Sequence, residues 1–412
     1  MKGIATRYGC LKFPSYNWVL GGSTISLIAE QIDMLALNWL VYQWTNSPML
    51  LGIFTFFRLI PLLLFSFVGG LLADRWDRRK LLVRLQFGMM MLTFLLAFSV
   101  AADLKNLYIL AGLVLLRSTL MAIETPVWHA YMPNLVDKPS VTSAVAVFST
   151  CVNLARIIGP ALGGFFIEWW GVENLFFLTA SGYIAILGAL LYAERFTEGQ
   201  VVQTGSKPLP DTHPPKAKAG MGEALTYLRR QPTLLQVLLL GVITMVFGFS
   251  YTSMMPVFAQ DLLGLDASGF GYLLSAAAVG SVIGAMFLAG QEEWGLGRLL
   301  VISGTLFGLC LFLFGFSRSF PLSLCLMFFV GLVGQTFRTT NRVIFQQRVP
   351  DRLRGRVMSL VLSDRGFIPL GSLLVGYVAQ TSGSPAALQT MGLVCMAAAL
   401  IAVLAARRLL KM

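Results

Sequence analysis

Charged residues are scarce in this sequence. Only 12% of the 412 residues are Asp, Glu, Lys or Arg, while 56% are hydrophobic; an average soluble domain has about 25% charged residues. The mean hydropathy is +0.74, so there are too few polar side chains to cover a surface in water. This composition excludes an ordinary soluble protein and indicates that lipid surrounds most of the chain.

Cysteine and histidine are also rare. The five Cys are an odd number without metal-ligand spacing, and His129 and His213 lie far apart. A disulfide framework and a zinc site are therefore not expected, and no cofactor is expected either. The chain also lacks a nucleophile constellation and a nucleotide-binding loop, so an enzyme is the least favoured class. The first sixteen residues are polar and basic and precede a run long enough to span a bilayer, which argues against a cleavable signal peptide.

Long apolar runs dominate what is present. A spanning helix needs about 20 predominantly apolar residues, and continuous runs without strand alternation favour helices over a barrel. The sequence predicts an all-α membrane protein with twelve spans, at 18–42, 50–73, 81–102, 107–129, 141–169, 174–193, 233–259, 268–290, 299–317, 320–341, 357–380 and 386–405.

The basic excess has a strong side preference. The chain has 31 Lys and Arg against 19 Asp and Glu, a net charge of +12. With the N-terminus placed in the cytoplasm, 24 of the basic residues fall on inner segments, two on outer segments and five inside spans. This asymmetry predicts cytoplasmic N- and C-termini. It also accounts for the positive charge without a nucleic-acid partner.

The spans form two sets of six. The segment 194–232 is rich in Pro, Gly, Lys and Thr, so we expect one bundle at 1–193, a cytoplasmic linker at 194–232 and a second bundle at 233–412. At an offset of 218 residues, Asp74 aligns with Glu292, and Leu81-Leu82-Val83 with Leu299-Leu300-Val301. Chance similarity between apolar helices is the alternative, but this match falls at a polar loop. A parallel repeat of two bundles is typical of secondary transporters with a central site.

The stretch from Gly69 to Lys80 (GGLLADRWDRRK) resembles the loop between the second and third helices of the major facilitator superfamily. Asp77 stands where that pattern usually has Gly, as it does in the drug:proton antiporter branch, which includes macrolide efflux proteins and the enterobactin exporter. Three further stretches resemble the same branch: 38–47 (NWLVYQWTNS), 155–164 (ARIIGPALGG) and 347–360 (QRVPDRLRGRVMSL). The resemblance implies the major facilitator fold and a proton-coupled exporter.

In this family the loop latches one state of the transporter, so the resemblance suggests a gate. Its residues here are Gly70, Asp74, Arg75, Asp77, Arg78 and Arg79. Gly70 is expected to let neighbouring helices approach closely. Asp74 is expected to lie at the positive end of the helix that begins near Val357, while the Arg side chains bind headgroups or nearby acids. A plain topology signal is the alternative.

A second motif lies in the fifth span. Gly159 and Pro160, followed by Gly163 and Gly164, combine a missing backbone donor with small faces, which permits a kink and close packing. The stretch resembles a motif associated with antiporters, although Ala155 replaces its first Gly. A structural kink without a transport role is equally compatible with these residues.

Ionisable residues inside the spans are the main candidates for function, because each costs about 2.5–3.5 kcal/mol near the bilayer centre on insertion scales. From estimated depth we predict an Asp33–Arg58 pair and a second pair between Arg338 and Asp364. Glu30 and Asp33 share one helical face, and two carboxyls at one cavity favour proton loading and release. Structural ion pairs are the alternative. The candidates are Glu30, Asp33, Arg58, Arg117, Glu124, Arg156, Arg338, Asp364 and Arg365.

Together these features predict a multi-pass protein of the bacterial cytoplasmic (inner) membrane. We expect a monomer in the lipid bilayer that exports an amphipathic small molecule, such as a drug, siderophore or lipid-like metabolite, in exchange for protons by rocking two bundles. The Arg residues leave room for an anionic cargo. An importer or proton-independent facilitator is one alternative, and a transporter-like ligand receptor is another.

Overall fold

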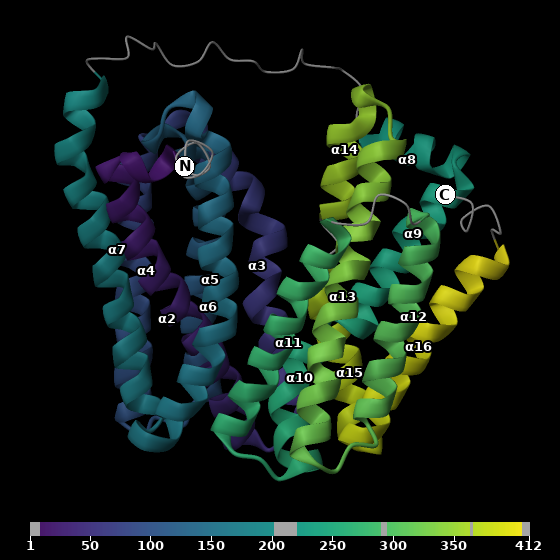
Figure 1. The fold of residues 1–412 in the computed structure, drawn as a ribbon. Coiled ribbons are helices and arrows are strands. Elements are labelled where there is room, and N and C mark those ends of the chain that lie inside the picture. The colour runs from purple at the N-terminus through teal and green to yellow at the C-terminus, as the bar shows by residue number, and fades with distance from the viewer. Residues whose placement is uncertain (1–8, 202–220, 290–294, 363–365, 406–412) are drawn as a thin grey trace. The chain divides into compact units, whose positions relative to one another are not determined.

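The computed structural model describes residues 9–201, 221–289, 295–362 and 366–405. Within those ranges the chain is nearly all helical and has no strand (Figure 1). The first group of helices is α2 (Pro14–Thr45), α3 (Pro48–Arg75), α4 (Arg78–Ala101), α5 (Leu107–Tyr131), α6 (Val141–Trp170) and α7 (Val172–Val201), with short turns η1 (Gly9–Lys12), η2 (Met132–Leu135) and η3 (Lys138–Ser140).

The second group begins with α8 (Met221–Arg230) and a long segment made of α9 (Pro232–Ile243), η4 (Thr244–Gly248), α10 (Tyr251–Val257) and η5 (Phe258–Leu262). Both η4 and η5 are π-helical turns. The remaining helices are α11 (Ala267–Ala289), α12 (Leu296–Phe314), α13 (Phe320–Arg348), α14 (Asp351–Leu362), α15 (Ile368–Ser382) and α16 (Ser384–Ala405).

Eleven of the described segments are long and apolar enough to cross a membrane. They coincide with eleven of the twelve spans predicted from the sequence. The other prediction, 357–380, covers the end of α14, residues 363–365 outside the described ranges, and most of α15. Several helices are longer than predicted: α2 starts at Pro14 and α13 ends at Arg348, because a helix can continue past the apolar core of the bilayer.

The internal repeat is visible in the packing of α4 and α12. With the offset of 218 residues, the first residue of α4, Arg78, corresponds to the first residue of α12, Leu296. Leu82 and Leu300 are both fully buried. Each helix contacts its equivalent neighbours: α4 packs on α5 and α7, and α12 packs on α13 and α16. Hydrophobicity alone does not impose a common register on two helices, so this agreement supports a genuine repeat.

The connections repeat as well. Gly171 joins α6 to α7 with φ of +81°, and Gly383 joins α15 to α16 with φ of +86°. Both lie in the left-handed region, where a side chain would be strained. The same tight reversal therefore ends the corresponding helix in each half.

The chain divides into two compact units: Met1–Leu40 with Phe57–His213, and Val41–Phe56 with Pro214–Met412. The hairpin 41–56 thus packs within the second unit. Two hydrogen bonds join the hairpin to the rest of that unit: Tyr42 Oη donates to Asp261 Oδ1 at 2.5 Å, and Ser47 Oγ donates to Gln380 Oε1 at 2.8 Å. Cutting the chain only at the central linker would place this hairpin in the first bundle.

Part of the predicted linker is helical. Helix α7 runs on to Val201, and α8 occupies 221–230. Glu223 of α8 forms ion pairs with Arg352 and Arg356 of α14, the latter at 3.1 Å. Two Arg of the stretch 347–360 therefore hold α8 against α14.

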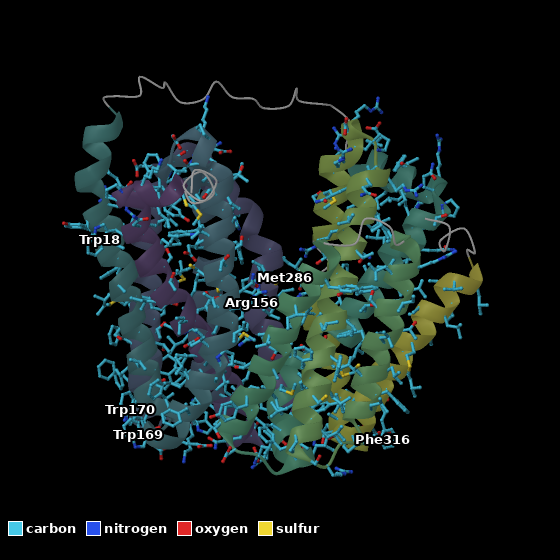
Figure 2. All side chains as sticks on the ribbon, viewed as in Figure 1. Trp18, Arg156, Trp169, Trp170, Met286 and Phe316 are labelled. Atoms are coloured by element: carbon cyan, nitrogen blue, oxygen red, sulfur yellow. The ribbon has the colours of Figure 1, made fainter. Side chains whose placement is uncertain are left out.

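Aromatic side chains mark two levels in the first unit. Trp169 and Trp170 stack at the end of α6 with ring centroids 5.4 Å apart, and Trp18 packs edge-on against Tyr192 at 4.8 Å. Figure 2 shows Trp18 toward one end of this unit and the Trp169–Trp170 pair toward the other. Exposed Trp at two such levels is typical of the two interfaces of a membrane.

Candidate functional site

Among the described residues of the first unit, Arg117 of α5 and Asp33 of α2 form an ion pair between two helices. Arg117 of α5 donates from Nη1 to Asp33 Oδ1 at 2.8 Å and from Nη2 to Asp33 Oδ2 at 2.5 Å. Arg117 Nη1 also donates to Thr93 Oγ1 of α4 at 3.2 Å. The two ionised side chains are only 11% and 10% exposed. This bidentate arrangement is the strongest geometry available to a guanidinium and a carboxylate.

The predicted pairing of Asp33 with Arg58 is wrong. Arg117 takes both carboxylate oxygens, and the described residues include no hydrogen-bond or ion-pair partner for the Arg58 side chain. The charge of Arg58 still interacts with those of Asp33 and Glu30. The prediction used depth along the helices alone. Depth places two residues at one level in the membrane, but it does not set the direction in which either side chain points.

Glu30 is the centre of the wider charge cluster. Its carboxyl interacts electrostatically with Asp33, Arg117, Arg156 and Arg58. None of these cations lies within ion-pair distance of it, and Arg156 has no hydrogen-bonded partner in the described part of the chain. Figure 2 places Arg156 of α6 between the levels of Trp18 and of Trp169. The cluster therefore combines the closed Asp33–Arg117 pair with charged side chains that form no ion pair with the described residues.

Glu124 does not join Arg117, although the two residues lie seven apart on α5. Its Oε1 instead accepts a hydrogen bond from Gln86 Nε2 of α4 at 2.8 Å. Gln86 is itself buried, and its own carbonyl oxygen has no partner. Glu124 also interacts electrostatically with the carboxyl of Glu30. The Glu124 carboxyl is thus half-buried, and the side chain that donates to it is neutral.

Three residues of this site were missed by sequence reasoning: Gln86, Thr93 and Tyr183. Gln86 and Thr93 are seven residues apart on α4, as Arg117 and Glu124 are on α5, so the two helices share two polar contacts two turns apart. That matched spacing in adjacent spans was the available signal. Tyr183 of α7 interacts with the Arg117 charge and had no comparable signal.

In the second unit, Arg338 of α13 lies with its guanidinium carbon 4.6 Å from the ring centroid of Phe249. Its Nη2 donates to Gln335 Oε1 at 2.6 Å. Asp364 and Arg365 lie outside the described residues, so the predicted Arg338–Asp364 pair stays a prediction.

The signature loop between α3 and α4 is mostly anchored to its own unit. Asp77 caps α4 by accepting the Lys80 amide at 2.8 Å. Arg78 donates from Nη1 to Ala130 O at 3.0 Å, and Arg79 donates from Nε to Leu190 O at 2.8 Å. The Asp at position 77 thus has a local structural role, because Asp is a preferred N-cap.

Asp74 and Arg75 differ from the rest of that loop. Both are exposed, and no side-chain hydrogen bond or ion pair links either of them to another described residue. A contact of Asp74 with the helix that begins near Val357 would join the two units, and it stays a prediction.

The close helix contact at this loop is made by Gly69, not by Gly70 as predicted. A Cβ on Gly69 would lie 2.3 Å from Ile123 O of α5, whereas a Cβ on Gly70 would meet no described atom within 4 Å. Both residues are glycine, so residue type does not distinguish them. The structure does, because an added Cβ would point in a different direction at each position.

This difference yields a matched test. Gly69→Ala should lower the thermal stability of the purified protein by about 1–3 kcal/mol, because backbone cannot yield to an added methyl group. Gly70→Ala should leave stability unchanged to within about 0.5 kcal/mol. Thermal unfolding in detergent measures both, and equal effects of the two substitutions would contradict the assignment.

The motif in α6 packs against α2. A Cβ on Gly159 would lie 2.5 Å from Gln31 Cβ, and one on Gly163 would lie 3.3 Å from Ile32 Cα. Gly159, Pro160, Gly163 and Gly164 are all buried, and α6 continues through Pro160. The motif brings α6 close to the helix that carries Glu30 and Asp33, whereas its link to antiport stays a prediction.

Comparison with known proteins gives the family of this chain. A family model described as a transmembrane secretion effector matches residues 5–411. The chain belongs to this family, a branch of the major facilitator superfamily. The superfamily resemblance of its motifs is thereby confirmed.

Several known transporters have similar sequences. The staphyloferrin A transporter of Staphylococcus aureus is 30% identical over 92% of each chain. Macrolide efflux protein A of Streptococcus pyogenes is 22% identical over 92% of each chain. The multidrug efflux pump Tap of Mycolicibacterium fortuitum is 24% identical over 90% of this chain and 91% of the pump.

Solved structures share the fold. A peptide transporter named POT matches 97% of this chain and 95% of its own with a TM-score of 0.74 at 13% identity. A bacterial homologue of the human lysosomal transporter Spinster matches 97% of this chain and 98% of its own with a TM-score of 0.67 at 16% identity. At such identities the likeness shows the fold alone.

The chain is therefore a multi-pass integral membrane transporter and not an enzyme, as the sequence predicted. Its substrates are small molecules.

Proposed function

We propose that this transporter exports an amphipathic small molecule in exchange for protons. The observation that supports this proposal is the contrast within one unit between the closed Asp33–Arg117 pair and the carboxyls of Glu30 and Glu124, which lack a cation at ion-pair distance among the described residues. Proton coupling needs a carboxyl that is protonated when its partner leaves and ionises when its partner returns.

In this mechanism a proton competes with Arg117 for Asp33. Protonation of Asp33 weakens its charge-assisted bonds to Arg117, and the released guanidinium charge acts on Glu30 and on bound substrate. Glu124 offers a second loading position within electrostatic reach of Glu30. Efflux pumps among the relatives support the export direction. The proposal includes cytoplasmic N- and C-termini and a monomeric transporter. Its two bundles, at 1–193 and 233–412, rock about a central site.

Transport into inverted membrane vesicles tests this proposal. With erythromycin and ethidium as probes, an imposed pH gradient should drive accumulation of at least one probe, and collapse of the gradient should release it. Uptake that persists unchanged without the gradient would favour a facilitator. Saturable binding without flux would favour a ligand receptor.

We also propose that Asp74 is part of a conformational gate. Asp74→Asn should then change the labelling rate of cysteines introduced along the transport pathway by a few fold, because the substitution removes the charge that holds one state. Asp137→Asn, which alters another exposed acid in a loop of the same unit, is the control. If labelling is the same in both variants and the parent, the loop serves topology only.

A further inference from the structure

Helix α8 lies directly before a membrane span and is separated from it by a break in the backbone. Gln231, between α8 and α9, has φ of −115° and ψ of 80°, because the residue before a proline is pushed out of the helical region. The span that follows runs from Pro232 to Leu262. Helix α8 therefore ends at the boundary of a span, where lipid headgroups meet the protein.

One face of α8 packs on its own unit. Ala224 and Leu228 are buried, and Glu223 beside them forms the ion pairs with Arg352 and Arg356 of α14. Figure 1 shows α8 and α14 at the same end of the second unit. These contacts fix the rotation of α8 about its axis and so decide which residues face outward.

The opposite face of α8 is exposed and basic. Its residues Leu225, Thr226, Arg229 and Arg230 are all exposed, Leu225 to 44%. The period of 3.6 residues per turn places them on the side away from the buried residues. No described residue forms a hydrogen bond or an ion pair with the side chain of Arg229 or Arg230. This face therefore presents two cations and an apolar side chain together.

The end of α13 adds a third cation. Tyr227 Oη of α8 donates to the backbone carbonyl of Arg348 at 3.5 Å, which places the last residue of α13 beside α8. Arg348 is exposed, and its side chain has no hydrogen-bond or ion-pair partner in the described part of the chain.

The acids of α8 and α14 do not neutralise these three arginines. Glu223 is held between Arg352 and Arg356, and Asp351 pairs with Arg354 at 2.5 Å. Both carboxylates are thus used by arginines of α14. The charge of the exposed face of α8 and of the end of α13 stays positive.

We infer that the surface formed by Leu225, Arg229, Arg230 and Arg348, the α8 surface, binds the headgroup of an anionic phospholipid. A phosphodiester carries a negative charge and accepts charge-assisted bonds from guanidinium groups. Basic residues beside a span are attracted to anionic lipids, and Leu225 offers a contact for the acyl chain. Position favours a lipid over a free anion, because the surface adjoins the start of a span. This lipid site goes beyond the proposed transport function and does not depend on it.

A fluorophore at the α8 surface tests this inference in the purified full-length transporter. Bimane on a cysteine introduced by Thr226→Cys, with the exposed Cys325 replaced by Ala, is quenched when a nitroxide-labelled lipid binds next to it. We compare phosphatidylglycerol, which is anionic, with phosphatidylcholine, which has no net charge, both with the same labelled acyl chains. Half-maximal quenching should need about tenfold less phosphatidylglycerol, and added salt should reduce this preference.

Variants link the preference to the arginines. Arg229→Gln combined with Arg230→Gln should remove most of the preference for phosphatidylglycerol. Lys105→Gln combined with Arg318→Gln is the control, since it removes two charges from exposed residues outside the α8 surface and should leave the preference unchanged. Equal quenching by the two lipids, or the same preference in both double variants, would overturn the inference.

Two further outcomes separate this inference from its rivals. If inorganic phosphate displaces the labelled phosphatidylglycerol at equal concentration, the surface binds a free anion and the lipid assignment is wrong. Lipid binding needs no proton gradient, so failure of gradient-driven uptake of erythromycin or ethidium would contradict the proposed function and leave the lipid preference intact.

Discussion

Asp33→Asn is expected to abolish pH-gradient-driven transport. The substitution removes the carboxylate that closes on Arg117 and leaves that guanidinium without its ionic partner in a site where only about a tenth of each side chain is exposed. Removal of one member of a buried pair costs about 3–5 kcal/mol, so a drop in thermal stability should accompany the loss of coupling. Substrate binding is expected to persist. Vesicle uptake, probe binding and thermal unfolding measure the three effects.

Two further variants separate coupling from stability. Asp33→Asn combined with Arg117→Gln removes both charges and should recover much of the lost stability without recovering gradient-driven transport. Arg58→Gln should cost less stability than Asp33→Asn, because Arg58 forms no ion pair with the described residues. Full transport activity in Asp33→Asn would remove this pair from the mechanism, and an equal stability loss in Arg58→Gln would argue for the pairing that the structure lacks.

Glu124→Gln is expected to uncouple transport from protons with little loss of stability. A Gln at this position keeps the shape of the side chain, and its carbonyl oxygen can still accept from Gln86 Nε2, but it cannot bind or release a proton. We expect gradient-driven accumulation to fall at least about tenfold, while exchange of labelled for unlabelled substrate continues without a gradient.

Glu173→Gln is the matched control, because Glu173 is an exposed carboxyl on the first turn of α7. It should leave both modes of transport unchanged. Loss of exchange as well as accumulation in Glu124→Gln would show that Glu124 serves substrate binding or folding and not proton loading. Equal accumulation in Glu124→Gln and the parent would place the proton elsewhere.

The sequence located the motifs of this chain but did not predict the role of every residue in them. The loop at 69–80 was identified, yet its close helix contact falls on Gly69 and the Asp at 77 is a helix cap. The predicted span at 320–341 ends just before Arg342, whereas α13 continues to Arg348. Apolar runs locate the part of a helix in lipid, but a helix ends where its backbone bonding ends, which hydropathy does not report.

Composition and order along the chain were enough for the membrane class, for eleven of the predicted spans, for the repeat and for the family. These are properties that each segment carries by itself, since burial in lipid depends on local apolar area. The partners of the charged residues were not available in this way. Asp33 pairs with Arg117 and Glu124 with Gln86 because helix rotation and packing direct those side chains toward one another, and these depend on contacts between segments far apart in sequence.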